Sequence, residues 1–219
     1  MSSNESSETE PSRAELVTDV ERLNAENGKL KRFLHSMQDL SESLEAATNE
    51  AHLHELLGQI LDHACEAVEA RDASLLVLDE DNDELVFVLS RGKVPPEQLA
   101  WRRIPAGEGI AGWVVTQREA TVVNNAQADE RFYSQLDMEL QFRTESILAA
   151  PIIGDSNVLG VIEIVNKIDG ELFNVHDQLM LSLLCRYAGE LLFALGRRAH
   201  GEVTKPRTAH SDAAVQLAG

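Results

Sequence analysis

The spacing of apolar residues along the chain changes near residue 50. Before that point, two rows of residues repeat every seven positions, and one row precedes the other by three residues. The later row is Leu16, Leu23, Leu30, Met37 and Leu44, and the earlier row is Val20, Asn27, Leu34 and Ser41. These rows are the d and a positions of a heptad repeat, so we expect a coiled-coil helix over residues 13–48.

The single Asn27 in this pattern favours a parallel, two-stranded coiled coil in register, because two buried Asn side chains satisfy each other only in that pairing. Gly28 and Ser41 weaken the seam locally. The sequence therefore predicts a homodimer. The alternative is an amphipathic helix that folds back on its own domain.

From Leu53 onwards the apolar residues form a broad stripe, which is typical of a helix that faces a core. The stripe is Leu53, Leu56, Leu57, Ile60, Leu61, Ala64, Cys65 and Val68. The next elements that we expect are strands at 73–79 and 84–90, a helix at 107–118, strands at 120–124, 147–153 and 158–166, and a helix at 175–195. The polar segment 125–146 has scattered aromatic residues and is expected to form short helices and loops.

Most of the consecutive strands are joined by tight turns, which indicates a mostly antiparallel sheet and an α+β fold. The helices from both ends of the domain would cover one face. The segment between residues 107 and 146 would cover the other face as a lid over a small-molecule pocket. We expect one globular domain over 49–196, with disordered tails at 1–12 and 197–219.

The formal net charge of −18 makes nucleic acid and anionic membranes poor candidate partners. Cys65 and Cys185 are too few and too far apart for a disulfide framework or a metal-type Cys pair, which favours a reducing cytoplasm. The seven His residues show no metal-ligand spacing with Cys, so no metal site is expected. No apolar run reaches the roughly 18 residues of a membrane helix.

Four stretches of the chain resemble the GAF domain family, in particular the GAF domains of cyclic-nucleotide phosphodiesterases. They are 75-LLVLDEDNDELV-86, 104-IPAGEGIAGWVV-115, 141-QFRTESILAAPI-152 and 158-VLGVIEIVNK-167. The resemblance covers about residues 50–196 and implies the α+β GAF fold. Function resides in the site rather than in the fold, so the ligand is a separate question.

The stretch 166-NKIDGELFNVHDQ-178 is similar to the NKFDE motif of that family, with counterparts at Asn166, Lys167, Phe173 and Asp177. Gln178 stands where the family has Glu. The resemblance implies that Lys167 and Asp177 form an ion pair that holds the ligand-bound conformation. The alternative is local: Asn174 is a good helix N-cap, Asp177 can reach back to it, and Lys167 is a solvated charge at the end of a strand.

The resemblance also implies which residues would line the pocket. They are Ser74, Ser90, Arg91, Ile110, Ala111, Asp137, Thr144 and Glu163. Relatives that bind cyclic GMP have an aromatic and an acidic residue at the positions of Ser90 and Arg91, so this chain departs from the pattern there. The Arg91 guanidinium is able to stack on a base or pair with a phosphate, and peptide N–H groups near Gly109 can receive an anion. The alternative is that small residues such as Ser74, Ala111 and Thr144 only pack beneath loops.

These observations favour a non-enzymatic cytoplasmic sensor. It would bind a cyclic nucleotide or a similar anionic molecule, require no other cofactor, and signal through dimer geometry to a protein partner. No catalytic domain is expected after residue 196. The alternatives are a ligand-free scaffold for dimerisation and partner docking, and a methionine sulfoxide reductase that would use Cys65 or Cys185. Both cysteines are expected on helices that pack away from the pocket, which disfavours the reductase and also bilin attachment.

Overall fold

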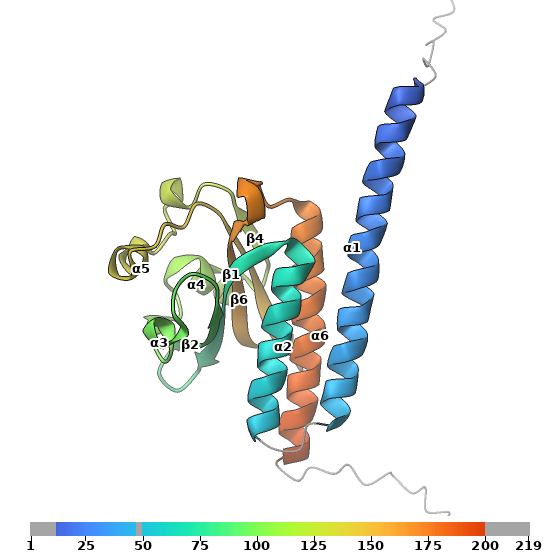
Figure 1. Ribbon diagram of the computed structural model, residues 1–219. Helices are drawn as coiled ribbons and strands as arrows, with labels where there is room; N and C mark the ends of the chain where they lie inside the picture. The colour runs from blue at the N-terminus through green and yellow to red at the C-terminus, as the bar shows by residue number, and fades with distance from the viewer. Residues whose placement is uncertain (1–11, 47–49, 200–219) are drawn as a thin grey trace, which may run out of the picture.

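The computed structural model describes residues 12–46 and 50–199. A six-stranded sheet in the order β3-β2-β1-β6-β5-β4 forms its centre (Figure 1). The strands are β1 (Ala70–Asp79), β2 (Glu84–Arg91), β3 (Arg103–Pro105), β4 (Thr121–Val123), β5 (Ile147–Gly154) and β6 (Asn157–Lys167). All paired strands are antiparallel, which confirms the predicted α+β class. The short strand β3 was not predicted.

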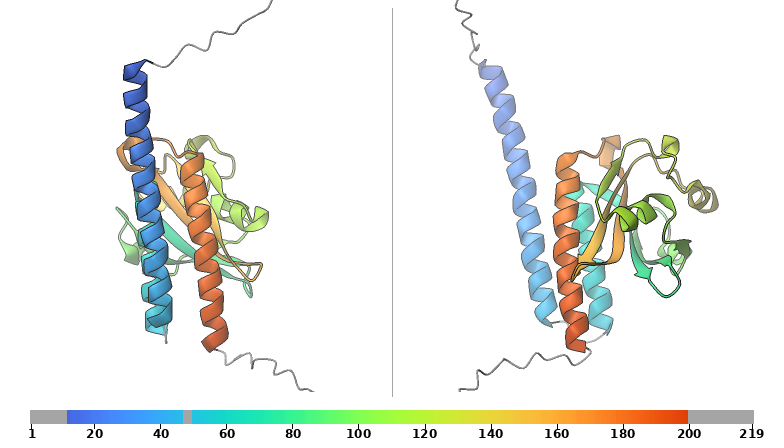
Figure 2. Two further views of the ribbon diagram at one scale, coloured as in Figure 1. Left: turned by 90° about the vertical axis from the view of Figure 1, so that its right-hand side faces the viewer. Right: turned by 180° about the vertical axis from the view of Figure 1, so that it is seen from behind.

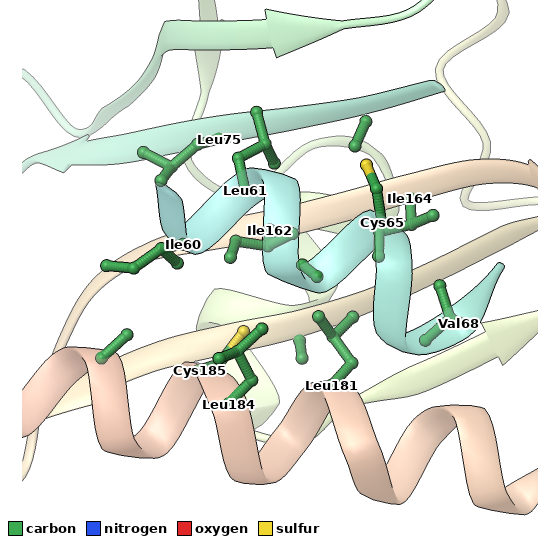
Figure 3. Close-up of a cluster of buried hydrophobic side chains, with 14 of the residues drawn as sticks. Ile60, Leu61, Cys65, Val68, Leu75, Ile162, Ile164, Leu181, Leu184 and Cys185 are labelled. Atoms are coloured by element: carbon green, nitrogen blue, oxygen red, sulfur yellow. The ribbon is translucent and has the colours of Figure 1, made fainter. Parts of the chain in front are cut away.

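Helices α2 (Glu50–Val68) and α6 (Val175–Ala199) lie side by side on one face of the sheet (Figure 2). Their apolar stripes meet the alternate residues of β1, β5 and β6 that point to this face. Figure 3 shows the contact: Ile60, Leu61, Leu75, Ile162, Ile164, Leu181 and Leu184 all lie in one buried cluster. This cluster is the main hydrophobic core.

Helix α6 can approach strand β5 closely because two glycines face each other. A Cβ atom on Gly189 would lie 2.1 Å from the carbonyl oxygen of Ile153, and one on Gly154 would lie 2.4 Å from the carbonyl oxygen of Gly189. No side chain larger than hydrogen fits at either position without a backbone shift. The two glycines therefore fix how near the helical layer lies to the sheet.

The opposite face of the sheet is covered by shorter elements. They are α3 (Pro96–Leu99), α4 (Gly109–Gln117), α5 (Ser134–Leu140) and the 3₁₀ turn Ala126–Ala128; another 3₁₀ turn, Ile168–Gly170, follows β6. A second buried cluster joins Leu76, Phe87 and Val161 of the sheet to Ile110 and Val114 of α4. The predicted arrangement, with terminal helices on one face and a lid on the other, is the observed one.

Helix α1 (Arg13–Ala46) lies outside α2 and α6, and its N-terminal part projects beyond them (Figures 1 and 2). It packs on the domain through Phe33, Ser36 and Leu40, which are all buried. The heptad residues Leu16, Val20, Leu23, Leu30 and Leu34 remain 50–56% exposed. At 100° per residue, the packed face and the exposed heptad face lie roughly 120° apart on the helix. The fold-back alternative thus describes one face of α1, and the heptad residue Met37 also packs against the core, while the five apolar heptad residues before it stay exposed.

Some expectations fall outside the described residues, namely most of the two tails and the side chain of Leu44. Within the described part, α1 starts at a reciprocal cap, in which Ser12 Oγ accepts the Glu15 N–H and Glu15 Oε2 accepts the Ser12 N–H. Helix α6 continues to Ala199, beyond the expected domain end at 196. No helix in residues 12–46 or 50–199 combines the length and apolar character needed to cross a bilayer.

Candidate ligand-binding site

A cavity of about 100 Å³ lies between the sheet and the elements that cover its lid face. Its floor is formed by the sheet residues Ser74, Phe87, Ile147, Glu163 and Val165. The start of α4 contributes Gly109, Ile110 and Ala111, and the lid contributes Phe132, Tyr133, Leu136, Asp137, Leu140, Phe142 and Thr144. The cavity is therefore mostly apolar, with a few polar groups at defined positions, as is usual for small-molecule sites.

Glu163 is the most unusual polar group of the cavity floor. It lies opposite Ser74 of β1 and Ala149 of β5, and its carboxylate accepts a hydrogen bond from the backbone N–H of Ala111. It keeps some accessible surface because it borders the cavity, yet burial raises the pKa of its carboxyl group to about 7 and the Ala111 bond only partly offsets this. Glu163 is thus placed to accept or donate a hydrogen bond near neutral pH.

Asp137 and Thr144 border the cavity and bond to each other. Asp137 Oδ2 accepts the Thr144 N–H at 2.8 Å, and Asp137 Oδ1 accepts the Thr144 hydroxyl at 2.7 Å. Gln127 Nε2 donates to the same carboxylate at 3.0 Å. These bonds join α5 to the segment that leads into β5, so the two residues hold the lid in place in this arrangement.

Arg91 also borders the cavity, but its guanidinium is bonded elsewhere. Arg91 Nε donates to Asp62 Oδ1 of α2 at 2.6 Å, and Nη2 donates to Asp62 Oδ2 at 3.3 Å. Arg91 pairs in the sheet with Ala73, a residue of the helix-side core, so its side chain points towards α2. The guanidinium is therefore not positioned for the expected stacking or phosphate contact, because it is bonded to Asp62.

Ser90, the neighbour of Arg91, pairs with Ser74 in the sheet and is buried. It does not border the cavity, although Ser74 does. Of the eight expected pocket residues, seven border the cavity: Ser74, Arg91, Ile110, Ala111, Asp137, Thr144 and Glu163. The aromatic residues of the lid, Phe132, Tyr133 and Phe142, were not singled out from the sequence.

Asn166 fixes the end of the lid rather than the cavity itself. Its Oδ1 accepts the N–H groups of Glu145 at 2.7 Å and Ser146 at 3.3 Å, and its Nδ2 donates to the carbonyl of Arg143 at 2.8 Å. The backbone of Asn166 has φ +55°, a conformation that Asn tolerates better than most residues. One side chain therefore ties three backbone groups of the lid to the end of β6.

Lys167 and Asp177 form the ion pair that the family resemblance implied. The Nζ–Oδ2 distance is 2.7 Å, and the two side chains are 2% and 5% exposed. The same Asp177 oxygen accepts the N–H of Asn174, and Asn174 Oδ1 accepts the N–H groups of His176 and Asp177. The helix cap and the ion pair are present together.

Phe173 is buried in the helix-side core, and Asn124 holds its backbone. Asn124 Oδ1 accepts the Phe173 N–H, and Asn124 Nδ2 donates to the Phe173 carbonyl, both at 2.9 Å. Asn124 was not recognised from the sequence, where 49 residues separate it from its partner. These two hydrogen bonds connect the end of β4 to the segment that leads into α6.

The two cysteines are buried in the helix-side core (Figure 3), and neither of them borders the cavity. Burial, assisted by the nearby Asp62 carboxylate, raises the pKa of the Cys65 thiol to about 12, and burial also raises the pKa of Cys185. Thiols of this kind are poor nucleophiles at neutral pH. In the part of the chain that the structure describes, no three His, Cys, Asp or Glu side chains gather as metal ligands.

An antiparallel sheet with terminal helices on one face, and a lidded cavity on the other, defines the class of α+β domain to which this chain belongs. The chain belongs to the GAF domain family, whose model matches residues 50–192. The GAF domain from a phosphoenolpyruvate-protein phosphotransferase of Coxiella burnetii has the same fold, with a TM-score of 0.65 and 23% identity. That match covers 78% of this chain and 97% of the other.

Curated relatives include phosphodiesterases. The chain is 31% identical over 139 residues to a protein described as "Probable 3',5'-cyclic phosphodiesterase pde-5" from Caenorhabditis elegans, which is 60% of this chain and 19% of that protein. It is 27% identical over 189 residues to the "Dual 3',5'-cyclic-AMP and -GMP phosphodiesterase 11A" of Takifugu rubripes, which is 80% of this chain and 20% of that protein. The chain thus spans about a fifth of these relatives, and the similarity lies in their regulatory GAF domain and not in the catalytic one.

Proposed function

We propose that this chain is a non-enzymatic cytoplasmic sensor, in which the lidded cavity binds a nucleotide-like small molecule and the helical layer passes the signal to a protein partner. The observation that carries the proposal is the placement of Glu163, a hydrogen-bonding carboxyl group on the floor of an otherwise apolar cavity. The Ala111 N–H satisfies only part of the hydrogen-bonding capacity of this carboxyl group, so a ligand that bonds to the rest would offset the cost of its burial.

The ligand class follows from the groups around the cavity. Glu163 and Asp137 accept hydrogen bonds from a ring with N–H donors, and the three lid aromatics Phe132, Tyr133 and Phe142 offer stacking faces. Two of the relatives are named for cyclic nucleotides, which carry such rings. A cyclic nucleotide is therefore the first ligand to test.

A route from the lid to the helical layer is built into the end of β6. Asn166 bonds to three backbone groups at the end of the lid, and the next residue, Lys167, is paired with Asp177 of α6. A ligand that prefers one lid position would thereby favour one position of α6. The ion pair and the lid anchor supply the link between binding and signal.

The open heptad face of α1 supplies the output. Five apolar heptad residues are exposed, while the domain is packed through another face of the same helix. A second copy of the chain would bury this face in a parallel coiled coil, with the two Asn27 side chains paired. The proposed sensor is therefore a homodimer, in which one face of α1 forms the dimer interface and another face packs on the domain.

Three measurements test the proposal. Isothermal titration with cyclic GMP and cyclic AMP should show binding that is weakened at least about tenfold by Glu163→Gln at pH 8, where the wild-type group is largely ionised and Gln lacks the charge. Exposed Glu97→Gln is the matched control. Binding that is unaffected by Glu163→Gln would remove the role of this residue.

Native mass spectrometry should give twice the mass of one chain, and Leu23→Glu should reduce it to the mass of one chain. Hydrogen exchange with and without ligand should then show slower exchange in the lid and at the start of α6. If ligand slowed hydrogen exchange in the lid but not in α6, the proposed signalling route would be wrong.

A second candidate is a ligand-free scaffold for dimerisation and partner docking. The volume favours it, because about 100 Å³ is well below the roughly 300–1,000 Å³ of typical ligand pockets. On this hypothesis no ligand would bind even at about 1 mM, and Glu163→Gln would change only the stability. On the sensor hypothesis the lid shifts outward to admit the ligand, and its hydrogen exchange falls on binding.

A further inference from the structure

A basic hollow lies at the surface beside the cavity. It has a volume of about 570 Å³ and is bordered by four cationic side chains, Arg71, Lys93, Arg143 and Lys167, and by two carboxylates, Asp72 and Glu145. This excess of cations stands out in a chain with a net charge of −18. The hollow is therefore a place where an anion is attracted although most of the surface repels it.

Two of these cations are unpaired. Within the described residues the side chains of Arg71 and Lys93 have no ion-pair or hydrogen-bond partner, and both residues are exposed. Arg143 has a long contact of 3.6 Å with Glu145, and both side chains are largely exposed. Lys167 is already paired with Asp177. The charges of Arg71, Lys93 and Arg143 are thus available to a ligand.

The position of Lys93 is fixed by the turn after β2. Asp72 Oδ1 accepts the backbone N–H of Lys93 at 2.7 Å, and Asp72 is buried. Gly92 has φ +116°, and a Cβ atom there would lie 2.2 Å from the same Asp72 oxygen. Only glycine allows this close turn, which sets Lys93 at the edge of the hollow.

The hollow and the cavity share a wall. Asp72 and Phe142 border both. In this lid position the cavity is smaller than a typical ligand pocket, so a ring bound in it leaves the adjoining hollow as the nearest space for the rest of a nucleotide. Its interior also carries the carboxyl groups of Glu163 and Asp137, which disfavour an anionic group and favour a hydrogen-bond donor.

We propose that the basic hollow is an anion subsite of the same binding site: the heterocyclic ring of a nucleotide lies in the cavity, and its phosphate lies in the hollow against Arg71, Lys93 and Arg143. This inference rests on the proposed ligand-binding function and goes further, since it assigns the two ends of the ligand to different surroundings. Phe142, at the shared wall, lies where the ring and the phosphate are joined.

The test compares nucleotides with the nucleosides that lack the phosphate. Cyclic GMP, cyclic AMP, guanosine and adenosine are titrated into the full chain by calorimetry. The bound nucleotide should have an affinity at least about tenfold above that of its nucleoside, and the difference should shrink as salt is raised, because the three cations are solvent-exposed. The double variant Arg71→Gln/Lys93→Gln should bring the nucleotide to within about twofold of the nucleoside and leave the nucleoside unchanged.

The matched control is Arg118→Gln/Arg186→Gln, which removes the same charge from exposed positions outside the hollow. It should keep the full preference for the nucleotide. Equal affinities for nucleotide and nucleoside in the wild-type chain, or an equal loss in both double variants, would overturn the subsite while the cavity remains a ligand site. Binding of neither class at about 1 mM would overturn the nucleotide form of the proposed function and the subsite together.

Discussion

Lys167 Nζ lies 2.7 Å from Asp177 Oδ2, and the two side chains are almost fully buried between the end of β6 and the start of α6. A buried pair of this kind contributes little relative to two apolar residues, because both charges lose their hydration. Removal of one partner is expensive, because it leaves the other charge without compensation.

The first prediction concerns this asymmetry. Asp177→Asn should lower the free energy of unfolding by about 3–5 kcal/mol, because Lys167 stays buried without its counter-charge. Denaturant unfolding measures the change. Lys167→Met/Asp177→Asn removes both charges and keeps an acceptor for the Asn174 N–H, so it should be more stable than Asp177→Asn alone. If the double variant is the less stable of the two, the pair stabilises the fold directly and the prediction is wrong.

A second prediction follows from the raised pKa of Glu163, which is about 7 in the folded protein against an ordinary value of 4.5. Between these values the folded state binds more protons than the unfolded state, so the contribution of Glu163 is fully present below about pH 4.5 and is lost as the pH rises through 7. Glu163→Gln should remove this loss. At pH 8 it should be more stable than the wild type by up to about 3 kcal/mol.

Urea unfolding at intervals from about pH 5.5 to pH 8 checks this prediction, with exposed Glu190→Gln as the control for charge alone. The stability difference between Glu163→Gln and the wild type should grow with pH. A constant difference would show that Glu163 titrates at its ordinary pKa in the folded state.

The third prediction concerns Asn166, which combines a positive φ with three side-chain bonds to the lid backbone. Asn166→Ala should cost about 2–3 kcal/mol of stability, because it loses the bonds and strains the backbone. Asn166→Gly loses the same bonds without the strain, and should cost about 1 kcal/mol less. Both variants should speed the hydrogen exchange of the Glu145 and Ser146 amides; unchanged exchange would argue against the anchor.

The fourth prediction separates the two faces of α1. Leu40 is fully buried against the domain and Leu30 is 52% exposed. Leu40→Ala should lower the free energy of unfolding by about 2–4 kcal/mol, because it leaves a cavity under the helix. Leu30→Ala should change the unfolding of the monomer by less than about 0.5 kcal/mol but weaken association in sedimentation equilibrium. Similar effects of the two substitutions on both measurements would mean that α1 has one functional face.

Much of the fold could be predicted because it follows from periodicity. The hairpins around EDND and GDSN, the alternating strands, and the broad stripes of the two terminal helices all appear in the sequence. Strand β3 could not be predicted, because its three residues, Arg103 to Pro105, are too few to show an alternation of apolar and polar positions and include a proline. Its pairing with β2 is a tertiary effect.

The site was less predictable because side-chain direction decides it. Ser90 and Arg91 are consecutive on a strand, so they point to opposite faces, and this signal was available for Arg91. The bonds between Asp137 and Thr144 had no such signal, since they depend on the conformation of the lid. On α1, Phe33 and Leu40 are seven residues apart and lie next to the a and d rows of the heptad repeat. This additional apolar pair indicates the face of α1 that packs on the domain.

The order of Asn166 and Lys167 in the chain has a mechanical consequence. Asn166 bonds to the backbone of the lid, and Lys167 pairs with Asp177 of α6 on the other face of the sheet. A single rigid peptide unit joins the Cα atoms of these two residues. A displacement of the lid and a displacement of α6 therefore act on two Cα atoms that are only about 3.8 Å apart. One glycine inserted between them would lengthen this connection and should weaken the coupling between the lid and α6.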